Sequence, residues 1–476
     1  MKHKFFILLA GILALFLILL LIKNCQECKD YPCKTEKGYV CPEYYEIKIQ
    51  THNYASMLGL TRYAPSDSTT PIIPLKDPDT TVVVKIPYVC NQIIFAPSLA
   101  SPHEEIMRKY LKCQGFKRDR TCACSDSLEL WTYQEPGDAN LIEVVKDPPK
   151  DASANTIGGL SLNYEINLDY LDTKARDSIP TAVIESNNGN STIKIGVSDS
   201  GVDLDSGSPI KNKGYLWKES NLSNDPCLNP GTFGLSKLTV DLNPSDIGGH
   251  GTFINGILIG AAYSNGQNQS KIPFKLELLN IKNSDHNSFS VFDAICGLYF
   301  GLEQGVKIFN ISWGFLEEKD GGASEIFKLF LRSTPPDVLL VAGTGNYGNG
   351  DSPSGVSLDD IARFWPACLA ETEPRVISVG ALNEKCDGMA LFSNYSFSTN
   401  RMTLFAPGEK ILSLATSQPP NGTPLQYVVG SGTSYATPFV TRKIAGFRSN
   451  NIPANEVKTM LQTSSTTMLG IPQIGM

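Results

Sequence analysis

The sequence predicts an α/β fold with a mostly parallel sheet flanked by helices. Apolar, β-branched runs alternate with helical stretches throughout residues 193–445, which is typical of strands buried on both faces. Several of these runs end in loops that contain glycine. Because open α/β sheets bind ligands at the carboxyl ends of their strands, we expect functional residues in these loops.

Three loops carry residues of chemical interest. The strand predicted over IKIGVS ends at Asp199. His250 and Ser434 each follow a glycine-bearing loop and begin an apolar helical run, in GGHGTFINGIL and GSGTSYATPFV. Pro438 is expected in the first turns of the second helix, where a missing N–H costs least.

An acid, an imidazole and a hydroxyl in these settings predict nucleophilic catalysis. A serine hydroxyl is a poor nucleophile at neutral pH and needs a base within hydrogen-bond reach. His250 can be that base, because an imidazole titrates near neutrality. Asp199 would hold the ring in the useful tautomer and stabilise the imidazolium that forms. Ser434 is then the nucleophile.

These segments resemble the subtilisin-like serine peptidase family (subtilase, S8), whose motifs are D-[ST]-G, G-H-G-T and G-T-S-x-A-x-P. Other segments that resemble the family occur in its order: VKIFNISWG (306–314), LLVAGTGNYG (339–348), FSNYS (392–396) and LFAPGEKILS (404–413). The resemblance covers roughly residues 160–470. It implies a serine endopeptidase that hydrolyses polypeptide substrates through an acyl-enzyme intermediate.

The resemblance also implies an oxyanion hole and a peptide-binding edge. Asn346 stands where the family has its oxyanion asparagine, with the backbone N–H of Ser434 as the second donor. The residues implied in substrate binding are Ser312, Trp313, Gly314, Gly343 and Gly345. No metal ligand is assigned. Calcium is implied as a cofactor by the family alone, because the sequence has no calcium-loop motif.

The chain departs from the family pattern near the site. Phe253 and Asn255 replace residues that are usually a second histidine and a small apolar residue, and Arg442 follows where small residues are typical. Trp313 either reshapes the pocket for the substrate side chain or belongs to the core. Asp246 either borders the cleft, as in the family, or caps the loop. Two rival functions follow: a catalytically weak or inactive subtilase-fold module for binding or assembly, and an ester hydrolase.

The N-terminus predicts a membrane segment. An unbroken apolar run extends from Phe5 to Ile22, and no small-residue cleavage site follows it. We interpret residues 1–23 as an uncleaved signal anchor, with residues 5–22 in the membrane and the peptidase domain on the periplasmic or extracellular side. The alternative is a cleaved signal peptide and a secreted protein.

The cysteines favour an exported protein stapled by disulfides. Of twelve cysteines, eight fall in the first 124 residues. Residues 24–80 are predicted to be a Cys-rich stalk. The pairs Cys25/Cys28 and Cys122/Cys124 leave zinc binding open, although no histidine accompanies either pair. Cys296 and Cys368 lie in apolar sequence and are interpreted as core thiols.

A small Cys-rich α+β unit is predicted over residues 81–150. It contains a strand in TVVVKIPYV, a helix in SPHEEIMRKYLKCQGF capped by Ser101, and a strand in LELWTYQ. Its place before the catalytic domain resembles an inhibitory prodomain, and the alternative is an accessory domain. Residues 136–160 are predicted to be a linker and cleavage zone, and residues 160–476 the peptidase domain.

Charge excludes one class of partner. The net charge is −7, and no basic stretch suggests binding of nucleic acid. Of the five histidines, His250 alone lies in a catalytic context.

Overall fold

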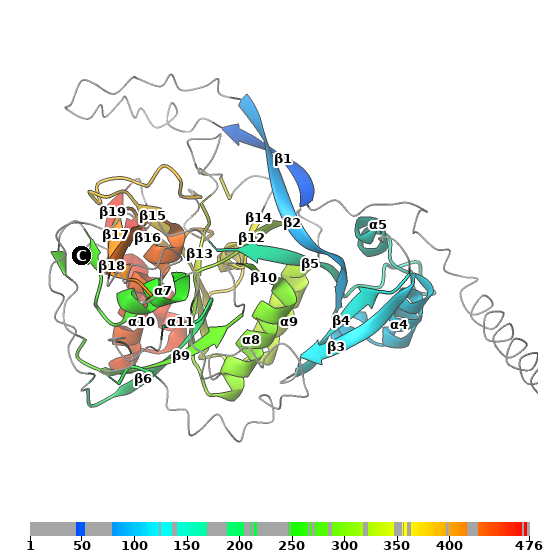
Figure 1. Ribbon diagram of the computed structural model, residues 1–476, viewed down its shortest axis with the longest axis horizontal. Helices are drawn as coiled ribbons and strands as arrows, with labels where there is room; N and C mark the ends of the chain where they lie inside the picture. The colour runs from blue at the N-terminus through cyan, green and yellow to red at the C-terminus, as the bar shows by residue number, and fades with distance from the viewer. Residues whose placement is uncertain are drawn as a thin grey trace, which may run out of the picture. The chain divides into compact units, whose positions relative to one another are not determined.

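The structure is a computed structural model (Figure 1). The residues it describes are 44–52, 79–122, 125–135, 140–168, 187, 189–203, 210, 214–216, 246, 249–264, 267–268, 272–283, 288–317, 322–346, 355, 357–358, 363–396, 398, 400–416, 427–468 and 471–473. The chain divides into two compact units. Among the described residues, unit 1 holds those of 89–163 and 322–326, and unit 2 holds the rest.

Unit 1 is an antiparallel sheet with a helix packed on it. Strand β3 (Phe116–Cys122) pairs with β4 (Ser125–Tyr133), which pairs in turn with the end of β2 (Asp79–Phe95). Helix α4 (Glu104–Cys113) is amphipathic and buries Met107, Tyr110 and Leu111. Two short helices, α3 (Pro97–Ala100) and α5 (Leu141–Lys146), complete the unit.

Three details of the N-terminal half differ from the prediction. The helix begins at Glu104, so the Ser101 cap is wrong; two glutamates in the first turn stabilise this start through the helix dipole. The predicted linker contains α5, where Tyr110 Oη donates to Val144 O at 3.1 Å. The predicted stalk contains β1 (Tyr44–His52), which pairs antiparallel with the first half of β2.

Unit 2 is built on the expected parallel sheet. The strand order is β19-β20-β16-β15-β13-β11-β6-β9, and the pairs from β16 through to β9 are parallel. The strands are β6 (Thr192–Asp199), β9 (Lys275–Lys282), β11 (Ile308–Ile311), β13 (Leu339–Gly343), β15 (Val376–Leu382), β16 (Leu404–Pro407), β19 (Thr466–Met468) and β20 (Ile471–Gln473). Their central residues are buried, as the apolar runs predict.

Helices cover both faces of this sheet (Figure 1). One core cluster joins Ile195 and Val341 to apolar residues of α7 (His250–Leu258), α10 (Thr433–Ser449) and α11 (Ala454–Thr463). The alternate strand residues face α8 (Val291–Glu303) and α9 (Ala323–Ser333), and Gly301 of α8 packs on Phe309. A 3₁₀ helix, η4 (Ala367–Glu371), precedes β15.

Smaller strand pairs lie around the sheet. β12 (Phe315–Glu317) pairs with β14 (Arg363–Trp365), and β18 (Tyr427–Gly430), β17 (Ile411–Leu414), β7 (Tyr263–Ser264) and β8 (Gln267–Asn268) form a second sheet. In unit 2, the end of β5 (Leu160–Asn167) pairs antiparallel with β10 (Ser288–Ser290), with Ile166 opposite Phe289.

The predicted membrane anchor lies outside the described residues. Among the helices that are described, none has the length and apolar character needed to cross a membrane. The disulfide prediction can be followed further, because Cys90, Cys113, Cys122 and Cys296 are disulfide-bonded. Cys296 is therefore not the core thiol that its apolar sequence suggests, whereas Cys368 is buried in η4.

Candidate active site

Asp199 ends β6 at the carboxyl edge of the sheet. It is fully buried, and its Oδ1 accepts a hydrogen bond from Ser200 N at 2.8 Å. Because β6 lies between two parallel neighbours, β9 and β11, the position of this carboxylate is fixed by the sheet register. The strand predicted from the sequence therefore ends at Asp199, as expected.

His250 is the first residue of α7. Gly249 precedes it with φ +74°, a left-handed turn that glycine adopts without strain and that aims the helix start at the sheet edge. His250 Nδ1 lies 2.8 Å from Asp199 Oδ1, and both side chains are fully buried. When Nδ1 donates its hydrogen to this carboxylate, Nε2 carries the lone pair that can accept a proton.

Ser434 is the second residue of α10 and lies beside Ser312. Ser434 Oγ donates to Ser312 O at 2.8 Å, and Ser312 Oγ donates to Ser434 O at 2.7 Å. The next residue, Tyr435, brings its ring to 5.5 Å from the His250 ring, centroid to centroid. The fold therefore gathers Ser434, Ser312 and His250 at one end of the sheet.

The second of these bonds has a cause within α10. Pro438 has no N–H, so the helix cannot supply the donor that Ser434 O, four residues earlier, would normally receive. Pro438 is the sixth residue of the helix and so lies in its first two turns, as expected, but beyond the four residues whose N–H groups have no partner within a helix. The Ser312 hydroxyl provides the missing donor.

Asn346 lies next to the first turn of α10. Its Oδ1 accepts from Thr433 N at 2.8 Å, and Thr433 Oγ1 accepts from Gly345 N at 2.9 Å. Gly345 has φ +91°, which allows the chain after β13 to turn toward the helix. With the oxygen of Asn346 held in this way, its NH₂ group is the part of the amide that can donate to a ligand.

The predicted substrate-binding residues have different surroundings. Trp313 is buried: its Nε1 donates to Ser198 Oγ at 3.1 Å, and its ring meets Phe289 edge-on, which agrees with the core interpretation. A Cβ on Gly343 would lie 3.1 Å from Thr437 Oγ1, so Gly343 packs closely against α10. Gly314 lies against the side chain of Phe364.

Asp246 caps the loop and the helix start around His250. Asp246 Oδ1 accepts from Ser200 Oγ at 2.7 Å and Gly249 N at 3.1 Å, and Oδ2 accepts from Thr252 N and Oγ1 at 2.7 and 2.6 Å. Burial raises the pKa of Asp246, while the bonds from Thr252 and Ser200 lower it. This geometry favours the capping interpretation.

Ser200 joins the two carboxylates and was missed by sequence reasoning. Its Oγ donates to Asp246 and accepts from Gly251 N at 3.0 Å, while its backbone N–H donates to Asp199. The available signal was the hydroxyl residue in the Asp-Ser-Gly motif. Ser200 is a positioning residue, because it ties β6 to the start of α7.

Replacing Asp246 with asparagine is expected to destabilise the protein. One oxygen that accepts from two donors would become an NH₂ group facing those donors, and each buried donor left unpaired costs about 1–3 kcal/mol. The melting temperature of Asp246→Asn should fall well below that of the wild type. Asp387→Asn, at an exposed loop carboxylate, is the matched control and should melt as the wild type does. Equal melting of all three proteins would contradict the capping role.

Two of the residues that depart from the family pattern, Phe253 and Asn255, are buried and packed beside the site. Phe253 is fully buried, with its ring 4.4 Å from that of Tyr435 between centroids. Asn255 Nδ2 donates to Gly251 O and to Asn280 Oδ1, both at 2.7 Å. Neither side chain displaces Asp199 or His250.

The described residues show no fit for calcium. No group of three or more His, Cys, Asp or Glu side chains among them is arranged to hold a metal ion. We therefore derive no chemical step that uses one.

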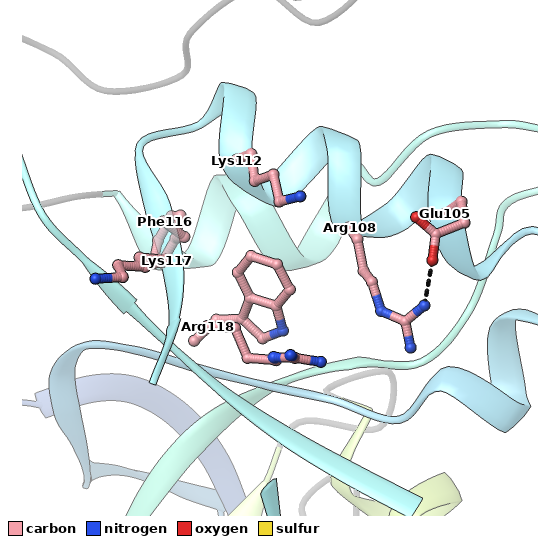
Figure 2. Close-up of a pocket in the computed structure, with 7 residues that line it drawn as sticks. Glu105, Arg108, Lys112, Phe116, Lys117 and Arg118 are labelled. Carbon is pink, nitrogen blue, oxygen red and sulfur yellow. Dashed lines mark hydrogen bonds and ion pairs between the residues drawn. The ribbon is translucent and has the colours of Figure 1, made fainter. Parts of the chain in front are cut away.

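A hollow of about 690 Å³ lies in unit 1, away from these residues in the sequence (Figure 2). Figure 2 shows Arg108 and Lys112 of α4 and Arg118 of β3 beside the hollow, which Trp131 also lines. Glu129 is nearly fully buried and accepts from Arg108 Nη2 at 2.9 Å and from Trp131 Nε1 at 2.9 Å. The hydrogen bond with Glu129 raises the pKa of Arg108, and this contact joins α4 to β4 within unit 1.

Known proteins resemble part of this chain. An intracellular serine protease of Paenibacillus polymyxa is 34% identical over 201 residues, which are 42% of this chain and 53% of that protein. The major intracellular serine protease of Bacillus subtilis (strain 168) is 28% identical over 206 residues, 43% of this chain and 56% of that protein. The match thus spans about half the length of these relatives.

Among solved structures, the self-cleaved protease domain of PatA is 23% identical, with a TM-score of 0.41, and the match covers 61% of this chain and 95% of that one. A model of the subtilase family matches residues 190–473. This match covers more than half of the sequence and contains Asp199, His250, Asn346 and Ser434. The chain belongs to the subtilase family.

Proposed function

We propose that the protein is a serine endopeptidase whose triad is Asp199, His250 and Ser434. The observation that carries this proposal is the buried pair of His250 Nδ1 and Asp199 Oδ1, 2.8 Å apart, on a helix that packs against the start of α10. A carboxylate in that position keeps the hydrogen on Nδ1 and leaves Nε2 as the base. Polypeptides are the substrates that the family implies.

The first chemical step is acylation. Ser434 Oγ attacks the carbonyl carbon of the scissile bond while its proton moves to His250 Nε2. The imidazolium, stabilised by Asp199, gives this proton to the leaving amine as the C–N bond breaks, which leaves an ester on Ser434. In the second step, His250 Nε2 takes a proton from water as the water oxygen attacks the carbonyl carbon of the ester. The C–O bond to Ser434 then breaks, and the imidazolium returns the proton to Ser434 Oγ, which releases the acid.

Asn346 supports both steps. Each attack places a negative charge on the former carbonyl oxygen, and donors fixed in advance stabilise it. Asn346 offers its NH₂ group because its oxygen accepts from Thr433 N. The backbone N–H of Ser434 is proposed as the second donor.

The hydroxyl of Ser434 has to turn before it reacts. Its hydrogen is donated to Ser312 O at 2.8 Å, which is not the direction of proton transfer to a base. A rotation about χ1 breaks one hydrogen bond of ordinary strength, about 1 kcal/mol net, so it is a minor barrier. A substrate strand that binds at Ser312 would favour the rotation by competing for this carbonyl.

A fluorophosphonate probe tests the enzymatic function directly. We expect the probe to form a covalent adduct at Ser434, found by mass spectrometry of a tryptic digest, and His250→Ala to prevent it. An unlabelled Ser434 in folded wild-type protein would favour the inactive binding module instead. Turnover of matched peptide and ester substrates separates a peptidase from an ester hydrolase.

We further propose that the chain before residue 168 inhibits the enzyme until it is cut. Within unit 2, Glu165, Ile166 and Asn167 add to β10 as an antiparallel strand. The Tyr164 ring stacks on that of Phe315, one residue after Gly314, with 4.9 Å between centroids. An extended segment added to a sheet edge is one way in which proteins bind peptides. The rival interpretation of residues 81–150 is an accessory domain.

Self-processing follows from this arrangement. Wild-type protein should yield two fragments, whereas Ser434→Ala should accumulate as one full-length chain. We expect the cut at the end of the 136–170 region, beyond Asn167, because backbone paired in a sheet is a poor substrate. Mass spectrometry of both purified proteins measures the fragments. A single, active wild-type chain would show that the N-terminal part is an accessory domain.

For localisation we propose a membrane-anchored protein with its peptidase domain exported. The basis is the apolar run of residues 5–22 together with the disulfide-bonded cysteines. The membrane is then a partner through residues 5–22, and nucleic acid is not expected to be one.

The anchor has its own test. Full-length Ser434→Ala should stay in the membrane fraction through high-salt and carbonate washes, since an apolar span resists both. A variant that lacks residues 1–23, expressed with a cleavable export signal, is the control and should be released. A soluble product that begins near Cys25 and extends to the C-terminus would show a cleaved signal peptide.

A further inference from the structure

The ring of Phe364 is wedged between two glycine segments of the site. A Cβ placed on Gly314 would lie 2.2 Å from Phe364 Cε1, and one on Gly345 would lie 2.7 Å from both Cε2 and Cζ. Side-chain atoms do not approach this closely, so only glycine at both positions leaves room for the ring. Phe364 itself is 5% exposed.

The sheet register holds the ring in this place. Phe364 is the central residue of β14, which pairs antiparallel with β12 so that Phe364 lies opposite Leu316. The same pairing sets Trp365 opposite Phe315, and Trp365 O would lie 2.6 Å from a Cβ on Gly314. The chain that carries Phe364 is thus pressed against the segment that follows Ser312.

Both glycines adjoin the groups proposed to react. Gly314 is two residues from Ser312, whose carbonyl accepts from Ser434 Oγ at 2.8 Å. Gly345 precedes Asn346, the proposed oxyanion donor, and its N–H is held by Thr433 Oγ1 at 2.9 Å. Consider a substrate residue whose carbonyl carbon contacts Ser434 Oγ and whose carbonyl oxygen contacts the Asn346 NH₂ group. The Cα of that residue is bonded directly to this carbonyl carbon, so it lies close to both groups. Its side chain would enter the space between these two segments, where the ring lies.

We propose that Phe364 closes the pocket for the side chain on the acyl side of the scissile bond, and that it restricts this residue to glycine, alanine or serine. The inference rests on the proposed peptidase function and adds its substrate class. Close packing makes the restriction steep, because a larger substrate side chain would have to displace a ring that is held by a strand pair and by the backbone at Gly314 and Gly345.

A series of peptides that differ only in this residue tests the proposal. For the wild type, kcat/KM should fall by at least about tenfold from alanine to leucine, and further to phenylalanine. Phe364→Ala and the milder Phe364→Leu should raise kcat/KM for the leucine peptide relative to the alanine peptide. Phe330→Leu removes the same atoms from a buried ring on α9 and should leave the preference unchanged.

The outcomes distinguish a failure of this inference from a failure of the proposed peptidase function. The inference would be overturned if the wild type cleaved the leucine or phenylalanine peptide with the same kcat/KM as the alanine peptide, whatever the variants do. An unchanged preference in a Phe364 variant whose Ser434 still reacts with a fluorophosphonate would also overturn it. If Phe364→Ala does not fold, Phe364→Leu and the wild-type series decide. No hydrolysis of any peptide, with Ser434 unlabelled, would instead refute the proposed function.

Discussion

Ser434→Ala is expected to lower kcat for peptide hydrolysis on the order of 10⁶-fold, as the same change does in subtilisin, a relative. Without the hydroxyl no ester can form, and what remains is the rate that binding and the oxyanion donors give to attack by water. Ser312 keeps its own donor bond to the backbone carbonyl of residue 434, so the fold should survive the change. Turnover of a fluorogenic peptide and the melting temperature measure the two effects.

The size of this loss separates a nucleophile from a structural serine. Ser431→Ala is a matched control, because Ser431 is exposed in the preceding loop, where its Oγ accepts from Lys410 N at 2.9 Å. It should retain wild-type turnover. His250→Ala should match Ser434→Ala in size, and the double variant should lose no more than either one alone, since the two groups act together. Near-normal turnover by Ser434→Ala would end the proposed mechanism.

Asp199→Asn is expected to cost on the order of 10⁴-fold in kcat, with much less change in KM. The Asp199 oxygen that lies 2.8 Å from His250 Nδ1 also accepts from Ser200 N. An asparagine that turns its oxygen to Ser200 keeps the geometry but lacks the charge that stabilises the imidazolium. One that turns its NH₂ group to His250 forces the hydrogen onto Nε2, where the base is needed.

A charge-removing control is available for this change. Asp337→Asn breaks a surface ion pair with Lys307, and such pairs contribute only about 0–1 kcal/mol. Its kcat should equal that of the wild type. If Asp199→Asn also kept full kcat, Asp199 would be a structural acid, and the base would be oriented by another group. Circular dichroism of each variant verifies that the fold is retained.

The sequence predicts the sheet well because its signals are local. The run ending at Asp199, and the glycine loops before His250 and Ser434, specify strand ends and helix starts without help from distant residues. The subtilase α/β fold is confirmed, while the assignment of the three residues as a triad stays a prediction. The structure adds that Asp199 and His250 are in contact.

What the sequence could not predict depends on pairings between distant segments. The four bonds to Asp246 come from residues on both sides of it, and their geometry exists only once Ser200 and Thr252 are brought together by the fold. β5 pairs with β10 across more than a hundred residues, and no local pattern fixes such a register. The position of Phe364 is a further example. Its local sequence is typical of a core residue, and its contacts with Gly314 and Gly345 depend on segments that are distant in the sequence.

Pro438 makes the first turns of α10 dependent on Ser312. The helix lacks one internal bond at residue 434 and borrows its replacement from the Ser312 hydroxyl. Ser312 and Ser434 are consequently joined by hydrogen bonds in both directions, so a shift of the backbone at Ser312 would carry the start of α10 with it. In the proposed peptidase, this link would keep the nucleophile in register with the backbone that aligns the substrate.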